Sequence, residues 1–331
     1  MVKVLITGGA GFIGLHLAER MLKDGHRVVI CDNFSRAVKD PEFLQLADHR
    51  HCEMIEVDLL DENSVYSLGV DFDLIFHLAA IIGVQHVLAQ PYEVLTKNVV
   101  ILQNVISLAD SQKNLSRFLF ASTSEIYSGT QQQFDLTLPT PEDTPLAVGN
   151  LHHPRTSYML SKLYGEAMCL QSRLPFTIFR PHNIYGPRMG LSHVIPELCK
   201  KIYHCKISQE LEVYSVKHTR TFCYVSDAIE QLVRMSDLPK CEGKVLNLGT
   251  SSPETTIGDL ALTILRIANR KDLSIKQMPA TSGSPERRCP DMTITSELIN
   301  FSSEVSLIDG IQQTFNWYSE RVFKAGGISS K

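Results

Sequence analysis

The sequence lacks several features that would direct the interpretation elsewhere. None of its eight cysteines stands in a Cys-x-x-Cys pair, and the formal net charge is only −4. Unpaired cysteines, several of them inside apolar runs, predict buried thiols in a reducing compartment and give no sign of a disulfide framework or a zinc site. The small negative charge offers no basic field for nucleic acid or an anionic membrane surface.

Long hydrophobic runs are also missing. No apolar stretch approaches the roughly 20 residues that a membrane span requires, and the N-terminus shows no signal-peptide pattern. We therefore expect a cytoplasmic protein without a membrane segment. The pair His152-His153 has no carboxylate or cysteine at ligand spacing, so it is interpreted as part of a loop and no metal is expected. A chain of 331 residues that is 44% hydrophobic can form one large or two modest domains.

The first strand and turn organise the chain. An apolar run, Val4–Ile6, breaks into Gly8, Gly11 and Gly14, and a helical pattern follows. In this strand–turn–helix context, the first glycine permits a tight turn, the second lets a pyrophosphate approach bare backbone, and the third lets helix and strand pack closely. The unpaired N–H groups at the start of the helix attract an anion. The pattern predicts a dinucleotide-binding turn.

The second strand supports this interpretation. Arg27–Cys31 ends in Asp32, about 20 residues past the glycines, where a carboxylate meets the ribose hydroxyls of the adenosine. Because Asp32 would repel a 2′-phosphate, NAD is favoured over NADP. Arg36 argues against this preference for NAD, since it could cap a 2′-phosphate. A solvated loop arginine is the simpler interpretation.

Strands and helices continue to alternate, which predicts an α/β fold with a doubly wound parallel sheet. Further strands are expected at Glu53–Val57, Asp73–Ala80, Phe118–Ala121 and Leu174–Phe179, and a long helix at Pro91–Asp110. Asp58 follows the third strand and either accepts from the adenine amino group or caps the next helix. Ala79 and Ala80 end the fourth strand at the carboxyl edge of the sheet, where small side chains leave room for a cofactor.

The fifth strand runs into a polar segment, Ser122–Tyr127, where the nicotinamide half of a cofactor is expected. Residues 128–155 then form a long loop, which is either functional or mobile. The helix that follows carries Tyr158 and Lys162, four residues apart and therefore on one face. A lysine beside a phenol favours the phenolate, which can take a hydroxyl proton as hydride leaves the same carbon.

Taken together, these motifs resemble the extended short-chain dehydrogenase/reductase family, in particular its NAD-dependent nucleotide-sugar epimerases, dehydratases and decarboxylases. The resemblance runs from Thr7 to Asp291 and includes Thr7–Gly14 and Arg180–Arg188. It implies that Tyr158 is the catalytic base, that Lys162 lowers its pKa and holds the nicotinamide ribose, and that Thr123 binds the 4-hydroxyl of the sugar. The retained NAD takes hydride from carbon 4 and later returns it. The residues expected to bind NAD are Gly8, Gly11, Phe12, Ile13, Gly14, Asp32, Asn33, Asp58, Leu59, Leu78, Ala79, Ala80, Asn98, Ser122, Tyr158 and Lys162.

Glu125 bears on the type of reaction. A 4-epimerase has no obvious chemical use for this carboxylate, whereas a 4,6-dehydratase needs a base for the proton at carbon 5. UDP-glucuronate decarboxylases carry the same Thr-Ser-Glu as Thr123–Glu125. We therefore favour a decarboxylase resembling those that act on UDP-glucuronate, followed by a UDP-sugar 4-epimerase and then a 4,6-dehydratase. In the alternative interpretations Glu125 only orders its loop, or the chain is a non-catalytic NAD(H)-binding protein.

The resemblance also implies a nucleotide-sugar site, expected to take a UDP-linked sugar, in a smaller C-terminal domain. The residues expected there are Ser124, Asn183, Val194, Tyr214, Arg220 and Arg288. The two arginines are expected near the diphosphate, where a planar guanidinium suits phosphate, and in decarboxylases the second is implicated in the chemistry. One departure from the family pattern is His182, which replaces the commoner Phe before Asn183.

The expected domain division follows from the same motifs. Residues 1–180 form the NAD-binding Rossmann domain, to which segments near 217–249 return, and residues 181–216 and 250–325 form the substrate domain. A homodimer is expected through the helices that start near Pro91 and Tyr158.

Overall fold

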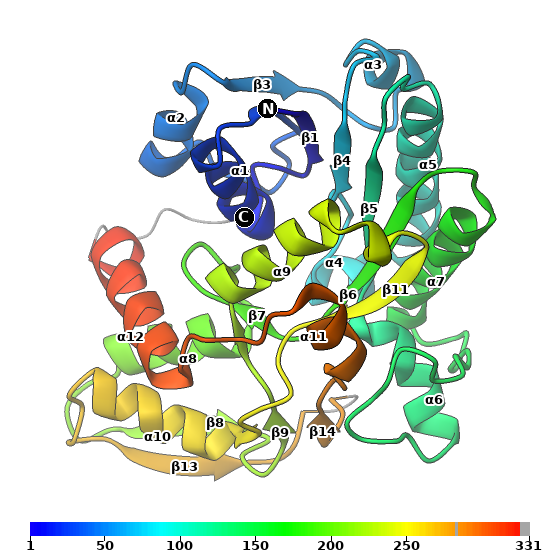
Figure 1. Ribbon diagram of the computed structural model, residues 1–331. Coiled ribbons are helices and arrows are strands. Elements are labelled where there is room, and N and C mark those ends of the chain that lie inside the picture. The colour runs from blue at the N-terminus through cyan, green and yellow to red at the C-terminus, as the bar shows by residue number, and fades with distance from the viewer. Residues whose placement is uncertain (282–283, 325–331) are drawn as a thin grey trace.

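The computed structural model describes residues 1–281 and 284–324, and its centre is a parallel sheet of seven strands. The strand order is β11-β6-β5-β4-β1-β2-β3, with every neighbouring pair parallel. The strands are β1 (Lys3–Thr7), β2 (Arg27–Asp32), β3 (Cys52–Glu56), β4 (Leu74–His77), β5 (Arg117–Ala121), β6 (Phe176–Pro181) and β11 (Lys244–Leu248). The predicted doubly wound sheet is confirmed (Figure 1).

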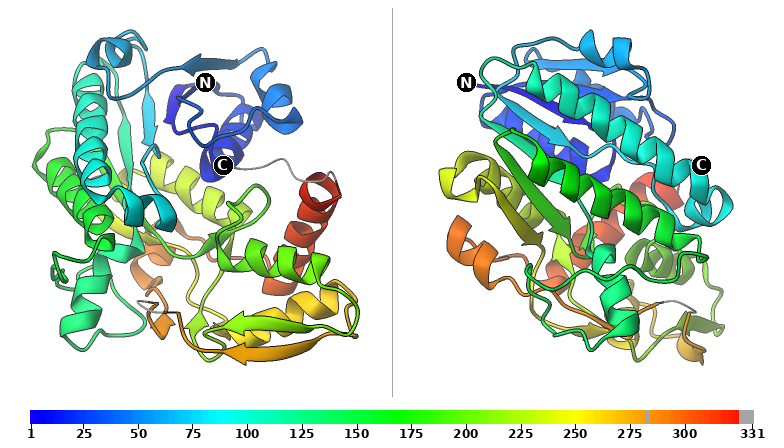
Figure 2. Two further views of the ribbon diagram at one scale, coloured as in Figure 1. Left: turned by 180° about the vertical axis from the view of Figure 1, so that it is seen from behind. Right: turned by 90° about the vertical axis from the view of Figure 1, so that its right-hand side faces the viewer.

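The sheet is covered on both faces because its strands are apolar on both sides. Along β1, for example, Leu5 belongs to one hydrophobic cluster and Ile6 to the other. Helices α1 (Phe12–Lys23) and α9 (Val225–Asp237) contribute to the cluster with Ile6. The cluster with Leu5 is formed with the short α3 (Glu62–Tyr66), α5 (Pro91–Asp110) and α7 (Arg155–Gln171), the last two of which lie side by side (Figure 2).

Several predicted boundaries hold and others shift. The helix expected at Pro91–Asp110 has those bounds, with proline in its first turn, where its missing N–H costs nothing. The fourth strand ends at His77, so Leu78–Ala80 form the loop after it. Residues 128–155 are not one loop, because α6 (Ser128–Gln133) follows directly on a 3₁₀ turn at Ser124–Tyr127.

The C-terminal part consists of small sheets and helices below the main sheet (Figure 1). Strands β8 (Glu210–Tyr214) and β13 (Ser274–Met278) pair in parallel, as do β7 (Ile184–Tyr185) and β10 (Cys223–Tyr224). A third sheet has the order β12-β9-β14. Its strands are β12 (Thr255–Thr256), β9 (Thr219–Arg220) and β14 (Arg287–Arg288). The α-helices after β7 that have not yet been named are α8 (Val194–His204), α10 (Ile257–Ile267), α11 (Thr293–Ile299) and α12 (Leu307–Tyr318). Two further short helices lie in the N-terminal half of the chain, α2 (Pro41–Ala47) and α4 (Val84–Ala89).

The chain leaves the main sheet after β6 and returns to it later. Strands within residues 219–224, at the start of the segment near 217–249 that was expected to return, pair within the small sheets. The return begins with α9, which packs on α1, and is completed by β11 at the edge of the main sheet. Residue 325, the predicted end of the substrate domain, lies outside the described residues.

Two further contacts join the parts beside the cofactor turn. Arg188 forms an ion pair with Asp40, the N-cap of α2, and lies 3.6 Å from a carboxylate oxygen of Glu42. A ring nitrogen of His16 in α1 is 3.1 Å from the carbonyl oxygen of Pro187. The segment after β7 is thereby fixed against α1 and α2.

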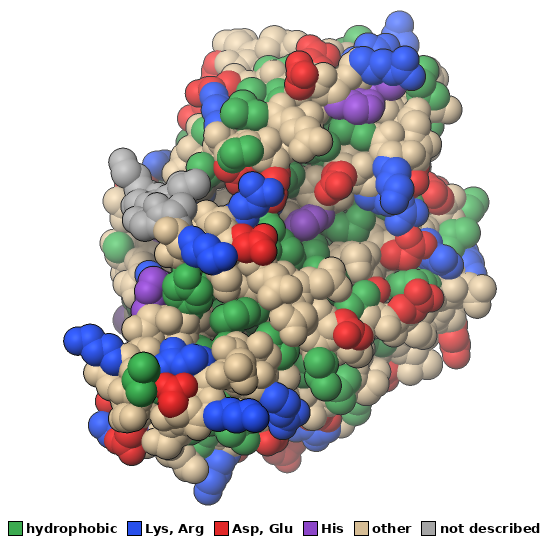
Figure 3. Space-filling model, turned by 90° about the vertical axis from the view of Figure 1, so that its left-hand side faces the viewer, with side chains coloured by type: hydrophobic (Ala, Val, Ile, Leu, Met, Phe, Trp, Pro, Cys, Tyr) green, Lys and Arg blue, Asp and Glu red, His purple; other side chains and the backbone are tan. Residues whose placement is uncertain are grey.

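The surface carries no dominant charge on the face drawn in Figure 3. Basic and acidic side chains are interspersed there, as the small net charge suggests. Among the described residues, no helix is both long enough and apolar enough to span a membrane.

Candidate active site

The glycine turn has the geometry that the sequence predicts for a pyrophosphate site. Gly8 has a φ of +68°, and a Cβ on it would lie 2.8 Å from the backbone nitrogen of Ala79. A Cβ on Gly14 would lie 2.5 Å from the carbonyl oxygen of Gly8. Gly11 is the N-cap of α1 and has no side chain to satisfy the first N–H groups of the helix, those of Phe12 and Ile13. These donors are therefore left for an anionic ligand.

Asp32 stands beside this turn at the end of β2. Its carboxylate accepts hydrogen bonds from the backbone N–H of Ala10 at 3.2 Å and of Phe34 at 2.9 Å. Burial raises the pKa of Asp32, and these hydrogen bonds oppose that effect. The carboxylate is thus held in place between the glycine turn and the following loop, which contains Asn33, and the residues present fit an adenosine ribose.

Other predicted cofactor residues prove to shape the backbone. Asp58 accepts from the N–H of Leu60, while Asp61 is the N-cap of α3, so the alternative that Asp58 caps that helix is wrong. Leu59 lies in the same turn, its carbonyl held by the amide of Asn104. Asn98 is buried, and its amide bonds both the N–H and the C=O of Ile81 and the hydroxyl of Ser161.

Asn98 therefore fixes the loop that follows Leu78–Ala80. Its expected contact with the cofactor stays a prediction.

Thr123, Tyr158 and Lys162 come together at the carboxyl end of β5. The hydroxyl of Thr123 caps the 3₁₀ turn by accepting from the N–H of Glu125, and it lies near enough to Tyr158 to influence the pKa of that phenol. Lys162 is buried, and its Nζ donates to the carbonyl oxygen of Ala121 at 2.7 Å. Burial lowers the pKa of Lys162 to about 8.

The expected lowering of the tyrosine pKa does not arise from the protein alone. Burial and the nearby carboxylate of Glu125 raise the pKa of Tyr158, and the influence of Thr123 only partly offsets them. The ammonium of Lys162 donates to the backbone carbonyl of Ala121, and its expected effect on the phenol stays a prediction. The sequence spacing placed the two side chains on one helix face, but it could not show which oxygen the ammonium would bind.

Glu125 is held by a partner that the sequence analysis missed. Nη2 of Arg155, the first residue of α7, donates to Oε1 of Glu125 at 2.8 Å. A cation at a helix N-terminus opposes the helix dipole, and this local conflict was the available signal that Arg155 has another task. The ion pair joins the polar turn after β5 to the helix that carries the tyrosine.

Beneath the site lies a buried charged network. Nε and Nη2 of Arg180 donate to the two carboxylate oxygens of Glu166 at 2.9 and 2.7 Å, and Nη1 donates to the hydroxyl of Tyr127 at 2.7 Å. Ser122 donates its hydroxyl to Glu166 at 2.5 Å. The side chain of Ser122 thus belongs to this network, and its expected contact with the cofactor stays a prediction.

Arg220 and Arg288 are register neighbours on β9 and β14. Arg220 is buried, and its two terminal nitrogens donate to three backbone carbonyls and the hydroxyl of Ser284. Burial and the adjacent Arg288 lower the pKa of Arg220 to about 10. Arg220 thus holds the segment that leads to β14, with only Nε–H left for a ligand.

Arg288 is placed differently. Burial lowers its pKa, and the carboxylate of Glu125 raises it, so the two side chains lie close enough to interact. The Arg288 side chain forms no hydrogen bond or ion pair with any of residues 1–281 and 284–324. A half-buried cation in that condition is suited to an anionic group of a ligand.

The other predicted substrate residues lie on separate elements of the C-terminal part. Asn183 has a φ of +44° and donates from Nδ2 to the carbonyl of Thr221 at 3.0 Å. Val194 is the first residue of α8, and Tyr214 ends β8 with its ring exposed below the ammonium of Lys201. Ser124 is buried in the wall of a small cavity.

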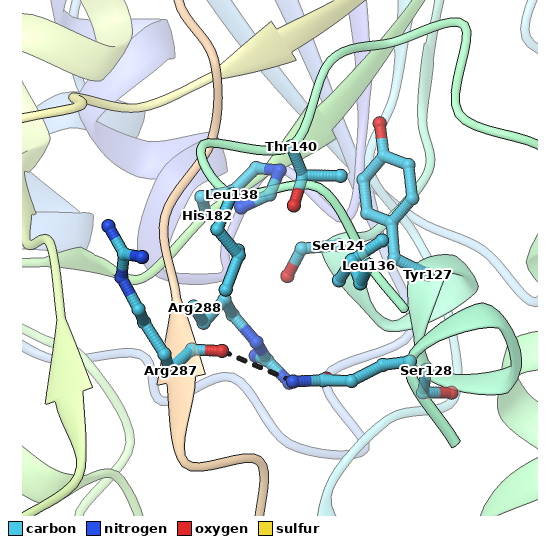
Figure 4. A pocket seen from close by; sticks show the side chains of 10 residues that line it. Ser124, Tyr127, Ser128, Leu136, Leu138, Thr140, His182, Arg287 and Arg288 are labelled. Atoms are coloured by element: carbon cyan, nitrogen blue, oxygen red, sulfur yellow. Dashed lines mark hydrogen bonds between the residues drawn. The ribbon is translucent and has the colours of Figure 1, made fainter. Parts of the chain in front are cut away.

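That cavity lies next to the catalytic turn (Figure 4). Ser124, Thr140, His182 and Arg288 surround it, with Leu136 and Leu138 forming an apolar part of the wall. The guanidinium of Arg287 points to the far side of its strand and pairs with Glu254. The segment 134–140 was expected only as part of a loop, and it forms one side of this cavity.

A second missed residue is Arg36, treated above as a cap for a 2′-phosphate or a solvated loop residue. Its guanidinium lies 3.8 Å from the position that a Cβ on Gly83 would occupy. Its charge lowers the pKa of both Tyr158 and His193, although burial is the larger influence on each. Arg36 therefore lies where its charge acts on Tyr158, which a loop position in the sequence could not reveal.

Comparison with known proteins gives a consistent picture. Residues 4–249 match the NAD dependent epimerase/dehydratase family. The chain is 35% identical to UDP-N-acetyl-alpha-D-glucosaminuronate decarboxylase of Bacillus cytotoxicus, over 96% of this chain and 98% of that protein. It is 30% identical to UDP-glucuronic acid decarboxylase 2 of Arabidopsis thaliana, over 97% of this chain and 69% of that protein.

A similar solved structure is the UDP-glucuronic acid 4-epimerase of Bacillus cereus in complex with UDP-glucuronic acid and NAD. The TM-score is 0.83 at 26% identity, covering 96% of this chain and 99% of that one. The similarity therefore extends over both parts of the chain, including the small sheets that carry Arg220 and Arg288.

Proposed function

We propose that this chain, which belongs to the NAD dependent epimerase/dehydratase family, removes the carboxyl group of a UDP-linked hexuronic acid as carbon dioxide. The chain is an NAD-dependent enzyme that acts on nucleotide sugars, so the interpretation as a non-catalytic NAD(H)-binding protein falls away. The observation that carries the decarboxylase proposal is the position of Glu125, whose ion pair with Arg155 holds its carboxylate where its charge acts on both Tyr158 and Arg288. It is supported by similarity to UDP-sugar decarboxylases over nearly the whole chain.

Tyr158 would take the proton of the 4-hydroxyl, with Thr123 hydrogen-bonded to the same oxygen. When bound, NAD supplies the hydride acceptor and, in its oxidised form, a positive charge that favours the phenolate. The buried ammonium of Lys162, anchored on Ala121, adds a second positive charge near this site. Gly8, Gly14 and Asp32 would hold the cofactor at the carboxyl edge of the main sheet.

Oxidation at carbon 4 makes the carboxyl group of a hexuronic acid β to a ketone. The electrons of the bond to the carboxyl carbon can then move toward the 4-keto oxygen, which Tyr158 and Thr123 stabilise as negative charge develops. Carbon dioxide leaves, and carbon 5 must gain a proton. Glu125, held by Arg155, would relay that proton from water to carbon 5.

Arg288 would hold an anionic group of the substrate, either the carboxylate before it leaves or the diphosphate. A guanidinium can bind either group through two hydrogen bonds. Arg220 would act mainly by fixing the segment that carries Arg288, because its terminal nitrogens are already bonded. Asn183, Val194 and Tyr214 remain proposed contacts of the nucleotide sugar.

A UDP-sugar 4-epimerase is the second candidate, favoured by the likeness to the Bacillus cereus enzyme. The two reactions share the oxidation step and differ in the mass of the product. Mass spectrometry after incubation with UDP-glucuronate and UDP-N-acetylglucosaminuronate therefore tests the proposal. Loss of carbon dioxide supports it, and an unchanged mass with a new sugar contradicts it in favour of epimerisation.

We further propose a homodimer through α5 and α7. These adjacent helices expose large apolar side chains, among them Tyr92 and Val100 on α5 and Tyr164 and Leu170 on α7.

A cytoplasmic location is proposed because all eight cysteines are free thiols, as in a reducing compartment.

A further inference from the structure

His182 is buried in the wall of the cavity beside Ser124 and Arg288 (Figure 4). One ring nitrogen, Nε2, is 3.0 Å from Oδ1 of Asn247. The other, Nδ1, is buried and has no hydrogen-bond partner among the described residues. Since buried polar atoms are nearly always paired in native proteins, this nitrogen requires an explanation.

The tautomer of His182 is fixed by its neighbour. The Nδ2 amide of Asn247 donates to the carbonyls of Thr140 and Asp291, both at 3.0 Å, which sets the orientation of the amide. Its Oδ1 must then accept, and it does so from the hydroxyl of Tyr127 as well as from His182. The proton of the neutral imidazole therefore sits on Nε2, and Nδ1 carries a lone pair.

The ring is also held neutral. Burial, together with the positive charges of Arg288 and Arg180, lowers the pKa of His182 to about 3. At physiological pH the ring is thus a hydrogen-bond acceptor placed next to the donors Arg288 and Ser124. The hydroxyls of Ser124 and Thr140 can donate or accept, whereas Nδ1 can only accept. A ligand group that meets Nδ1 must therefore donate a hydrogen bond, and a bare carboxylate oxygen is disfavoured at that point.

We propose that His182 is a specificity-determining residue, whose Nδ1 accepts a hydrogen bond from an O–H or N–H donor on the bound sugar. This inference rests on the proposed function, because it requires a nucleotide sugar in this site. Either a ring hydroxyl or the N–H of a 2-acetamido group can supply this hydrogen-bond donor. Removing the acceptor would leave that donor buried and unpaired, which weakens binding.

Two substitutions separate the roles of the two ring nitrogens. His182→Asn retains a side-chain acceptor near the position of Nδ1 but loses the donor to Asn247. His182→Gln retains a donor that can reach Asn247 but loses the acceptor near Nδ1. If the two nitrogens have different roles, the two variants should therefore differ in their KM for the UDP-sugar.

The experiment measures kcat and KM for both variants and for the wild type, with UDP-glucuronate and UDP-N-acetylglucosaminuronate, by following total consumption of the UDP-sugar. We expect His182→Gln to raise KM by about 10-fold, with kcat changed less, whereas His182→Asn stays within about 3-fold of the wild type. If His182→Gln matches the wild type while His182→Asn is impaired, the ring serves only Asn247 and the proposal is overturned. Equal KM values for all three proteins also overturn it.

A 2-deoxy-2-fluoro analogue of UDP-glucuronate identifies the donor, because fluorine cannot donate. If the difference between wild type and His182→Gln disappears with this analogue, the donor is the substituent on carbon 2, and if it persists, the donor is another hydroxyl of the sugar. Both results support the proposal. Failure of the proposed function is visible separately, since the wild type would then consume neither uronate, and that result would overturn both.

Discussion

Nη2 of Arg155 donates a 2.8 Å hydrogen bond to Oε1 of Glu125, across an interval of 30 residues. The contact joins the turn after β5 to the first residue of α7, and Tyr158 follows three residues later on that helix. Glu125 thus has both a structural partner and a position from which its charge acts on Tyr158 and Arg288. The structural effect of the ion pair and the electrostatic effect of the Glu125 carboxylate can be separated experimentally.

Replacing Glu125 with Gln should shift the pH profile of kcat/KM. The carboxylate raises the pKa of Tyr158, because a negative charge nearby disfavours the phenolate. Removing that charge lowers the tyrosine pKa, so the active deprotonated form is reached at lower pH and the acidic limb moves to lower pH. Glu125→Asp, which keeps the charge, is the control and should leave the limb nearly in place.

The same variant tests the proton delivery to carbon 5. We expect the kcat of decarboxylation for Glu125→Gln to fall by about 100-fold, in the range typical of a positioned acid or base. A variant with unaltered kcat but a lower melting temperature would assign Glu125 to ordering its loop alone.

Replacing Tyr158 with Phe should abolish turnover without loss of the cofactor. The phenol supplies the proton acceptor, so we expect kcat to fall by about 1,000-fold. The glycine turn and Asp32 lie away from this residue and should retain NAD, measured as NAD released after denaturation. Appreciable turnover in this variant would show that the catalytic assignment is wrong.

The sequence contained most of what positions the site. The glycine turn, Asp32, the helix Pro91–Asp110 and the pairing of Tyr158 with Lys162 on one face follow from local patterns and from the geometry of parallel sheets. The hydrogen-bond partners of the site residues were harder to predict from the sequence. Lys162 binds the backbone of Ala121 and Ser122 binds Glu166, because the choice among several nearby oxygens depends on packing between distant segments.

The contacts that the sequence did not predict mainly join residues that are distant in the chain. Arg155 and Glu125 are 30 residues apart, and Arg36 meets the catalytic end only because its loop folds over Gly83. The helix at Ser128–Gln133 was also missed, since its Gly-Thr-Gln composition resembles a loop and it is stabilised by the contacts of Thr130 with Pro145 and Ala147.

The buried pair Arg180 and Glu166 should contribute strongly to stability. Replacing Arg180 with Met leaves the carboxylate of Glu166 buried without its cation, which costs roughly 3–5 kcal/mol in comparable cases. The free energy of unfolding, measured in urea, should fall by about that amount. Arg287→Met, which removes an exposed ion pair with Glu254, is the matched control and should change it by less than about 1 kcal/mol. Similar losses for the two variants would contradict this account.

Replacing Tyr164 with Glu should convert the proposed homodimer to a monomer. Tyr164 is 56% exposed on α7, and a charge there would be buried unpaired if this face is covered by a second copy. Light scattering at micromolar concentrations measures the change directly. A wild type that is already monomeric would rule out the proposed interface, and a Tyr164→Glu dimer would place the interface elsewhere.

The central claim is that this enzyme removes carbon dioxide from a UDP-linked hexuronic acid. The most direct measurement is the mass of the product formed from UDP-glucuronate and from UDP-N-acetylglucosaminuronate. The account predicts that the product of at least one of them has lost the mass of carbon dioxide and that the enzyme-bound NAD is oxidised again at the end of turnover. A product of unchanged mass, or one that has lost water, would contradict it and assign Glu125 to an epimerase or a dehydratase.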